Sequence, residues 1–132
     1  MKKLLDSLTR IGELQARMHG LGRWRLSSLE RQQAGLNDDL RAIFEVLESG
    51  ELAYGPQARL AARHVGVLQR RLDSLAREQE TARRSVKEHG TRAKLAERAI
   101  ETAALRYRRL EERKELAEII EQAIARRNAS ST

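Results

Sequence analysis

Apolar residues return every three or four positions along most of this 132-residue chain. Spacing of this kind repeats every seven residues and predicts helices that pack against other helices along one apolar seam. The first run consists of Leu26, Leu29, Leu36, Leu40, Ile43 and Leu47, with Gln33 at the position that no apolar residue fills. The second run consists of Val65, Leu68, Leu72, Leu75, Gln79, Ala82, Val86, His89, Ala93, Ala96, Ile100, Ala103, Tyr107 and Leu110. The pattern therefore predicts two helices with one seam each.

Apolar residues upstream of the first run keep the same rhythm but not the same phase. They are Leu4, Ile11, Leu14, Met18 and Leu21. The step from Met18 to Leu26 is one residue longer than a heptad, and Gly20 and Gly22 lie within it. Because glycine weakens a helix, we expect the extra residue to be absorbed there. The sequence thus predicts a seam over residues 4–21 with a local irregularity behind it.

The segment SGELAYGP, residues 49–56, separates the two runs and contains the only proline of the chain. Gly50 suits the left-handed end of a helix, and Pro56 suits the first turn of the next helix. Two helices joined by so short a link are expected to lie antiparallel. We therefore predict an all-α fold, a two-helix antiparallel coiled-coil hairpin that forms a single domain. Its parts are helix 3–48, bend 49–56, helix 57–127 and a frayed tail over 128–132.

The two predicted helices differ in length. At ~1.5 Å per residue the first spans roughly 70 Å and the second roughly 105 Å. If the fold point lies near Leu52, residues pair when their numbers sum to about 104, so the second helix overhangs the first. The overhang carries a separate apolar stripe of Leu116, Ile119, Ile120, Ala123 and Ile124. An apolar stripe without a partner inside the hairpin indicates a partner outside it.

Composition narrows the class of protein. Only 3% of residues are aromatic, which argues against a globular core, because aromatic side chains supply much of the area that such cores bury. The net charge of +7 raises the question of phosphate binding. However, the arginines alternate with glutamates and are not clustered with aromatic residues. Nucleic acid is therefore the least favoured partner.

The sequence contains no arrangement that indicates catalysis or a bound metal. It has no cysteine, no Walker A sequence and no glycine-rich dinucleotide fingerprint. His64 and His89 would lie roughly 37 Å apart on one helix, too far to share a metal ion. His19 and His89 could meet across the hairpin, where we interpret them as polar seam residues that fix the register. We expect no enzymatic activity, cofactor, metal or small-molecule substrate, because a helical hairpin offers no enclosed pocket.

No apolar run approaches the ~18 residues that a membrane span requires. The charged start of the chain does not lead into the apolar core of a signal peptide, because Asp6 and Arg10 interrupt it. We therefore expect a cytoplasmic protein.

Two longer stretches resemble a known family. They are LAYGPQARLAARHVGVLQRRLDSL at the bend and KLAERAIETAALRYRRLEERKELAEII towards the C-terminus. The second is similar to the Arg/Glu-rich ending, K-L-x-E-R followed by E-R-x-x-E, of the FliJ/SctO family. These are the central stalk proteins of flagellar and virulence type III export ATPases. The first is similar to an Ala-Tyr-Pro turn of that family, although Gly55 stands between Tyr54 and Pro56 here.

The resemblance implies a non-enzymatic stalk that couples an ATPase to protein export. Its open end would enter the central hole of a hexameric export ATPase, and its bend would face the cytoplasmic domain of the export gate and substrate chaperones. Such a protein works in the cytoplasm, at the periphery of the membrane-embedded export apparatus. At the ATPase end the matching residues are Lys2, Lys3, Leu4, Leu5, Arg106, Arg109, Arg113, Leu116, Ile119, Ile120 and Ile124. At the bend they are Phe44, Leu47, Leu52 and Tyr54.

Two other function classes fit the same pattern. A self-associating coiled-coil scaffold would use the heptads between chains, and a basic rod could bind nucleic acid. For Phe44 and Leu47, ordinary packing in the seam is as good an interpretation as partner binding, and Tyr54 could serve only the turn.

Overall fold

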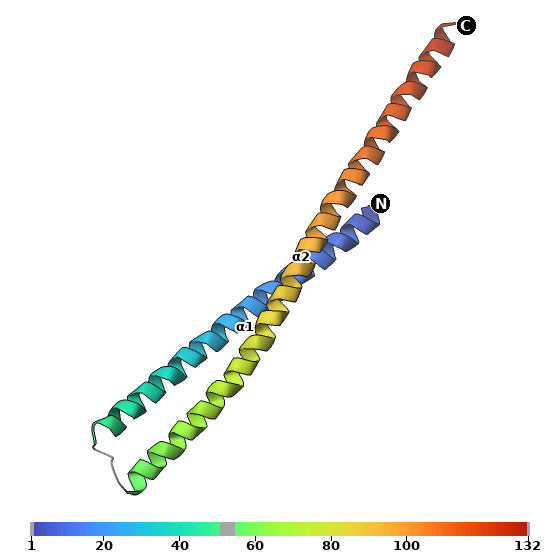
Figure 1. The fold of residues 1–132 in the computed structure, drawn as a ribbon. Helices are drawn as coiled ribbons and strands as arrows, with labels where there is room; N and C mark the ends of the chain where they lie inside the picture. The colour runs from blue at the N-terminus through green and yellow to red at the C-terminus, as the bar shows by residue number, and fades with distance from the viewer. Residues whose placement is uncertain (1, 51–54, 132) are drawn as a thin grey trace. The chain divides into compact units, whose positions relative to one another are not determined.

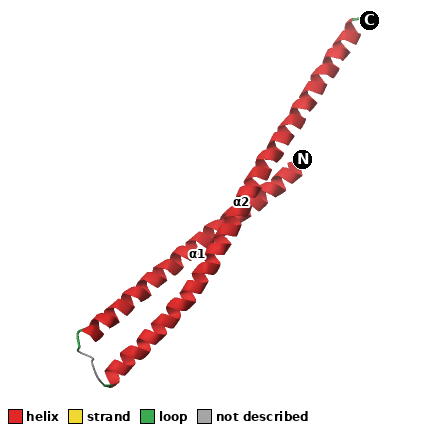
Figure 2. Cartoon of the chain, viewed as in Figure 1, coloured by secondary structure: helices red, strands yellow, loops and turns green. Residues whose placement is uncertain are grey.

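The computed structural model describes residues 2–50 and 55–131, and all regular structure within them is helical. Helix α1 is Lys2–Glu48 and helix α2 is Pro56–Ser130 (Figures 1 and 2). The two helices pack antiparallel and the second is the longer, which confirms the predicted fold class. Helix α2 ends at Ser130, whereas the sequence predicted that it ends at residue 127. There the hydroxyl of Ser130 donates a hydrogen bond of 3.0 Å to the Arg127 carbonyl, and that of Ser131 donates one of 3.0 Å to the Asn128 carbonyl.

The residues on either side of the bend end and begin the helices as predicted. Gly50 has a φ of 77°, and its amide donates to the carbonyl of Leu47, which gives α1 a left-handed end. Gly55 has a φ of 100°, and its carbonyl accepts the first hydrogen bond of α2, from the amide of Arg59. Pro56 occupies the first position of α2, where a proline leaves no helical hydrogen bond unmade. Leu52 and Tyr54 lie outside the described residues.

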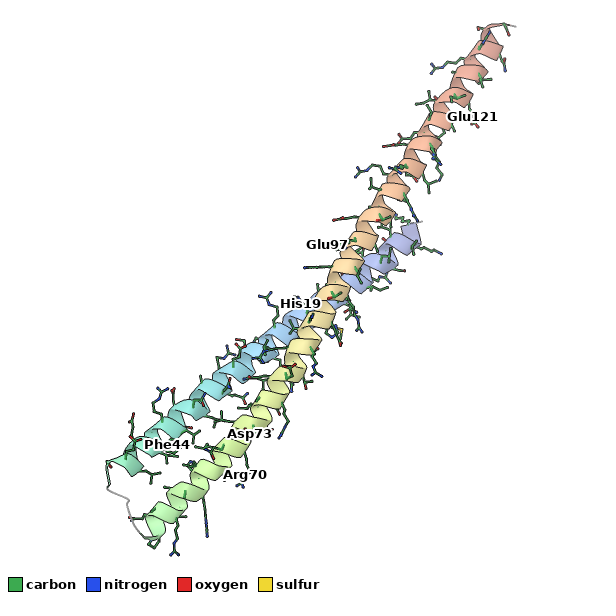
Figure 3. The ribbon with its side chains drawn as sticks, viewed as in Figure 1. His19, Phe44, Arg70, Asp73, Glu97 and Glu121 are labelled. Atoms are coloured by element: carbon green, nitrogen blue, oxygen red, sulfur yellow. The ribbon has the colours of Figure 1, made fainter. Side chains whose placement is uncertain are left out.

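The contacts of the chain group into two compact units, which are described separately. Unit 1 comprises Met1–Ala16 with Thr91–Thr132, and unit 2 comprises Arg17–Gly90. Each unit contains a segment of α1 and a segment of α2. The side chains that these segments carry are drawn in Figure 3.

Unit 2 contains the most deeply buried apolar residues of the described chain. Leu75 is fully buried and packs in a cluster with Leu29 and Ala82, against which Leu26 and Leu36 also lie. Leu40 and Leu68 are buried nearer the bend. These are the positions that the heptad pattern assigned to the seam. The predicted seam of unit 2 is therefore confirmed from Leu26 onwards.

A polar pair lies within this apolar seam. The side-chain amide of Gln79, only 3% exposed, donates a hydrogen bond of 2.9 Å to Oε1 of Gln33 and one of 3.4 Å to the carbonyl of Leu29. Each glutamine occupies the seam position that the sequence pattern gave it. The hydrogen bonds satisfy the buried amide, and they are made only when these two positions face one another.

Unit 1 has a seam that combines small and large residues. On α1 it consists of Leu5, Leu8, Gly12 and Gln15, all half-buried. On α2 it consists of Ala93, Ala96, Ile100, Ala103 and Tyr107, of which Ala103 is the most buried. A Cβ atom built on Gly12 would lie 3.0 Å from Cδ1 of Ile100 and 3.6 Å from Cβ of Ala96. Gly12 therefore lets the larger isoleucine approach the backbone of α1.

The seam predicted over residues 4–21 is wrong. Leu4, Ile11 and Leu14 are exposed in unit 1, as are Met18 and Leu21 in unit 2. In unit 2 the seam passes through His19 and Gly22 and keeps regular steps of three and four to Leu26, so Gly20 absorbs no extra residue. Gly22 lets Val86 approach the backbone of α1, as Gly12 does for Ile100, because a Cβ atom on Gly22 would lie 3.1 Å from Cγ2 of Val86. Glycines thus occupy two seam positions, 12 and 22, next to the positions 11 and 21 where the apolar pattern had placed Ile11 and Leu21.

The register also differs from the prediction. The numbers of facing residues sum to 108 for Gly22 and Val86 and to 112 for Gln33 and Gln79, rather than to about 104. The prediction assumed that the helix ends at the bend lie level. In unit 2 the register instead places Glu48, the last residue of α1, beside the second turn of α2. The first turn of α2 therefore lies beyond the end of α1.

Candidate functional site

Unit 1 contains all the residues that the sequence assigned to an ATPase-binding end. On α1, Lys2, Lys3 and Leu4 are exposed, whereas Leu5 is half-buried in the seam. Leu5 therefore serves helix packing, and the other three are accessible to a partner.

On α2, the three arginines of this set are exposed. They are Arg106, Arg109 and Arg113. The structure shows no ion pair for any of them within the described residues. Their guanidinium groups are thus open to solvent and to the carboxylates of a partner.

The apolar stripe of the C-terminal segment has no helix packed against it within unit 1. Every described residue from Glu112 onwards is exposed. The large apolar side chains are Leu116 (58% exposed), Ile119 (61%), Ile120 (50%) and Ile124 (54%). Glu121, labelled in Figure 3, marks this segment. A globular partner or a further helix could cover these side chains without displacing any part of α1 described here.

A groove of about 570 Å³ lies where the start of α1 meets α2 in unit 1. Its lining combines Lys2 of α1 with Glu111, Arg113 and Lys114 of α2, around the side chains of Tyr107 and Leu110. Lys2 and Arg113, both predicted for the ATPase-binding end, line this one groove. Its chemistry, three cationic groups and one carboxylate around an apolar floor, suits an acidic side chain or segment.

The residues assigned to the bend end belong to unit 2. Phe44 is 43% exposed and lines a groove of about 560 Å³ on α1 with Leu40, Arg41 and Glu45. Leu47 is half-buried in the seam. Phe44, labelled in Figure 3, is therefore available to a partner, whereas Leu47 packs between the helices.

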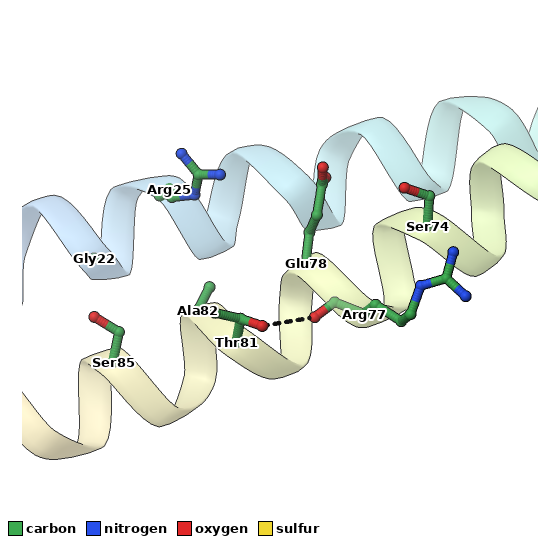
Figure 4. A pocket seen from close by; sticks show the side chains of 8 residues that line it. All are labelled: Gly22, Arg25, Ser74, Arg77, Glu78, Thr81, Ala82 and Ser85. Atoms are coloured by element: carbon green, nitrogen blue, oxygen red, sulfur yellow. Dashed lines mark hydrogen bonds between the residues drawn. The ribbon is translucent and has the colours of Figure 1, made fainter.

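A second groove in unit 2 lies over the close approach at Gly22 (Figure 4). It measures about 420 Å³ and is lined on one side by Arg25 and on the other by Arg77, Glu78 and Thr81. The hydroxyl of Thr81 donates a hydrogen bond of 3.1 Å to the Arg77 carbonyl. The lining also includes the hydroxyls of Ser74 and Ser85, and within the described residues no hydrogen bond joins either of them to Glu78.

His19 and His89, which the sequence predicted could meet across the hairpin, both belong to unit 2. The ring of His19 lies against Gly90, where a Cβ atom would be 3.1 Å from Nε2. His89 is half-buried in the seam. Within the described residues no group of three or more His, Cys, Asp or Glu could hold a metal ion.

Sequence reasoning missed several exposed apolar residues. Trp24, the only tryptophan, is 67% exposed in unit 2, and Leu95 is 58% exposed in unit 1. Ile11 and Leu14 were assigned only to the seam and lie outside it, whereas Leu4, which also lies outside the seam, was assigned to the ATPase-binding end as well. One signal in the sequence could have shown that Leu4, Ile11 and Leu14 lie outside the seam. Leu4 and Leu5 begin two stripes that are one residue apart, and two such stripes cannot both face the same partner helix.

In the part of the chain that the structure describes, no helix is long and apolar enough to cross a membrane. No protein-family model, curated protein or solved structure matches the chain.

Proposed function

We propose that the protein is a non-enzymatic stalk of a flagellar-type III export apparatus that docks the end carrying its termini in a hexameric export ATPase. The observation that carries this proposal is the exposed stripe of Leu116, Ile119, Ile120 and Ile124 on a segment of α2 that extends past α1. Burying one Leu or Ile side chain contributes ~1.5–3 kcal/mol, so leaving four exposed indicates an external binding site. The resemblance of residues 94–120 to the Arg/Glu-rich ending of the FliJ/SctO family supports the identity of the partner.

Three exposed arginines on the N-terminal side of the stripe support the same partner, while Glu112, Glu115, Glu118 and Glu121 lie along the stripe itself. Arg106, Arg109 and Arg113 have no ion pair within the described residues, and Lys2 shares a groove with Arg113. The wall of the axial hole in an ATPase ring would surround the end of an inserted helix on all sides. Acidic groups lining such a hole would pair with these cations while its apolar residues cover the stripe.

At the other end of the hairpin, the bend would face the export gate and substrate chaperones. The exposed ring of Phe44 beside a groove supports a contact there. This part of the proposal rests on one described aromatic residue, since Tyr54 lies outside the described residues.

Stimulation of the cognate ATPase tests the proposal. A chain in which Leu116, Ile119, Ile120 and Ile124 are all replaced by Gln keeps the charges and the helix propensity of the segment. Because these side chains contact no part of α1, the variant should retain the helicity and melting temperature of the wild type. We expect it to lose the stimulation of ATP hydrolysis by the hexamer.

A matched control replaces Leu60 and Val67, two exposed apolar residues of α2 in unit 2, by Gln. This control should stimulate the ATPase as well as the wild type does. If the stripe variant stimulates fully, the C-terminal segment is not the docking element. If it instead converts a stable dimer into a monomer, the stripe is a self-association surface and the protein is a coiled-coil scaffold.

A further inference from the structure

The paired part of unit 1 has two sides with different chemistry. In an antiparallel pair, the residues that precede the seam residues lie on the same side on both helices, and the residues that follow them lie on the other side. The preceding side of α1 consists of Leu4, Ser7, Ile11 and Leu14. The preceding side of α2 consists of Arg92, Leu95, Ala99, Thr102, Arg106 and Arg109. We call these ten residues the preceding face.

The preceding face carries the large exposed apolar residues. Leu4 is 55% exposed, Ile11 51%, Leu14 56% and Leu95 58%. The numbers of Leu14 and Leu95 sum to 109, within the register that the seam contacts define, so these two leucines lie level across the seam. The opposite face consists of Asp6, Thr9, Glu13, Ala16, Lys94, Glu97, Glu101, Ala104, Arg108 and Glu111 and has no large apolar residue.

Charge is divided between the same two faces. The five acidic residues of 1–16 and 91–111 all lie on the opposite face, where Glu97 is labelled in Figure 3. The preceding face has no acidic residue and three arginines, Arg92, Arg106 and Arg109. The preceding face therefore combines large apolar side chains with positive charge alone, whereas the opposite face carries charges of both signs.

This combination selects one kind of occupant. A second copy placed face to face would bring the arginines of both copies together, which is unfavourable. The apolar residues of α1 recur at heptad spacing, and the small Ala99 and Thr102 lie opposite them on α2. A row of anchors on one helix facing small residues on its neighbour matches the way in which an amphipathic helix lies in a groove between two others. A flat membrane surface would require no such spacing.

We propose that the preceding face binds an acidic amphipathic helix of a partner protein, which completes a three-helix bundle with α1 and α2. Its apolar side packs on Ile11, Leu14 and Leu95, and its flanking carboxylates pair with Arg92 and Arg106. This binding site shares Leu4, Arg106 and Arg109 with the proposed ATPase-binding end, but it goes beyond the proposed function, because its anchors Ile11, Leu14 and Leu95 lie on the paired residues rather than on the C-terminal stripe. It remains intact in the stripe variant described above, so the two proposals can fail separately.

Binding of a designed peptide to the full chain tests the inference. The probe is a fluorescent helical peptide of three heptads with Leu at the first and fourth positions of each and Glu at the flanking positions. A matched peptide has Lys in place of Glu. Anisotropy should show that the Glu peptide binds, that added salt weakens the binding and that the Lys peptide does not bind.

Two variants locate the binding site. The double substitution Ile11→Gln, Leu14→Gln should weaken binding at least about tenfold, because both side chains would be central anchors. Both are exposed, so circular dichroism should show an unchanged fold. The substitutions Arg92→Gln and Arg106→Gln should weaken binding and reduce its salt dependence. The control Leu105→Gln changes a residue that is 50% exposed but outside the preceding face, and it should bind as the wild type does.

Three results would overturn the inference. One is the absence of binding to the Glu peptide, and another is equal weakening by Leu105→Gln. The third is binding to vesicles of anionic phosphatidylglycerol, abolished by Ile11→Gln, Leu14→Gln, without binding to the peptide. That last result would make the preceding face a membrane-contacting surface.

Discussion

Replacing Gln79 by alanine should lower the free energy of unfolding of the hairpin by about 1–2 kcal/mol. The side chain is almost fully buried, and its amide donates to Gln33 and to the Leu29 carbonyl. Losing this hydrogen bonding costs ~0.5–1.5 kcal/mol, and losing the one buried methylene group that alanine lacks costs ~0.8 kcal/mol. Gln33 is only half-buried, so water can satisfy its amide in the variant.

Gln79→Leu separates the two contributions. It loses the same hydrogen bonds but fills the seam with an apolar side chain, so its stability should stay within about 1 kcal/mol of the wild type. Urea unfolding followed by circular dichroism at 222 nm measures all variants, and Gln69→Ala, the same change at an exposed position of α2, should shift stability by less than about 0.5 kcal/mol. If Gln79→Leu is as destabilised as Gln79→Ala, hydrogen bonding and not burial dominates at this position, and the reasoning fails.

Three further predictions concern packing, register and backbone. Leu75→Ala should cost about 2–5 kcal/mol in the same urea assay, because Leu75 is fully buried in the core of unit 2, and a loss below about 1 kcal/mol would contradict that burial. The double variant Gln33→Leu, Gln79→Leu should keep its stability, but the distance distribution between spin labels at the exposed positions 38 and 73 should broaden, because a buried polar pair fixes the register of a coiled coil. An unchanged distribution would show that other contacts fix the register. Gly20→Ala should raise the free energy of unfolding by about 0.5–1 kcal/mol, because Gly20 lies within α1 and a Cβ there meets no atom within 4 Å, and a lower stability would show a contact that the structure lacks.

The bend and most of the seam could be predicted from the sequence because their signals are local. Gly50 and Pro56 are residues whose backbone preferences end one helix and begin the next. From Leu26 to Leu47 the leucines and the isoleucine at heptad spacing are also the ones that the helices bury, whereas Phe44 and Val46, outside that spacing, are exposed. A heptad pattern identifies the seam correctly wherever large apolar residues occupy it.

The seam near the N-terminus could not be found this way, because packing there depends on complementary sizes across two helices. Gly12 and Gly22 are poor seam residues by hydrophobicity, yet they receive Ile100 and Val86. The apolar residues Leu4, Ile11 and Leu14 dominate the local pattern and so drew the prediction one residue away. A large apolar residue that precedes a small seam residue indicates a second packing face, and sequence alone does not show which face the partner helix within the chain will take.

The candidate site divides in the same way. The C-terminal stripe could be predicted because it requires only that α2 be longer than α1. The one-sided distribution of charge around Leu14 and Leu95 could not, because it becomes visible only when the phase of the seam in unit 1 is known.

Photo-crosslinking at Ile120 tests most directly the central claim that the C-terminal segment docks in an ATPase ring. Benzoylphenylalanine placed at Ile120 should crosslink to the cognate hexameric ATPase, whereas the same group placed at Gln69 in unit 2 should not. Crosslinks from position 120 only to a second copy of the chain, or equal yields from both positions, would contradict the claim.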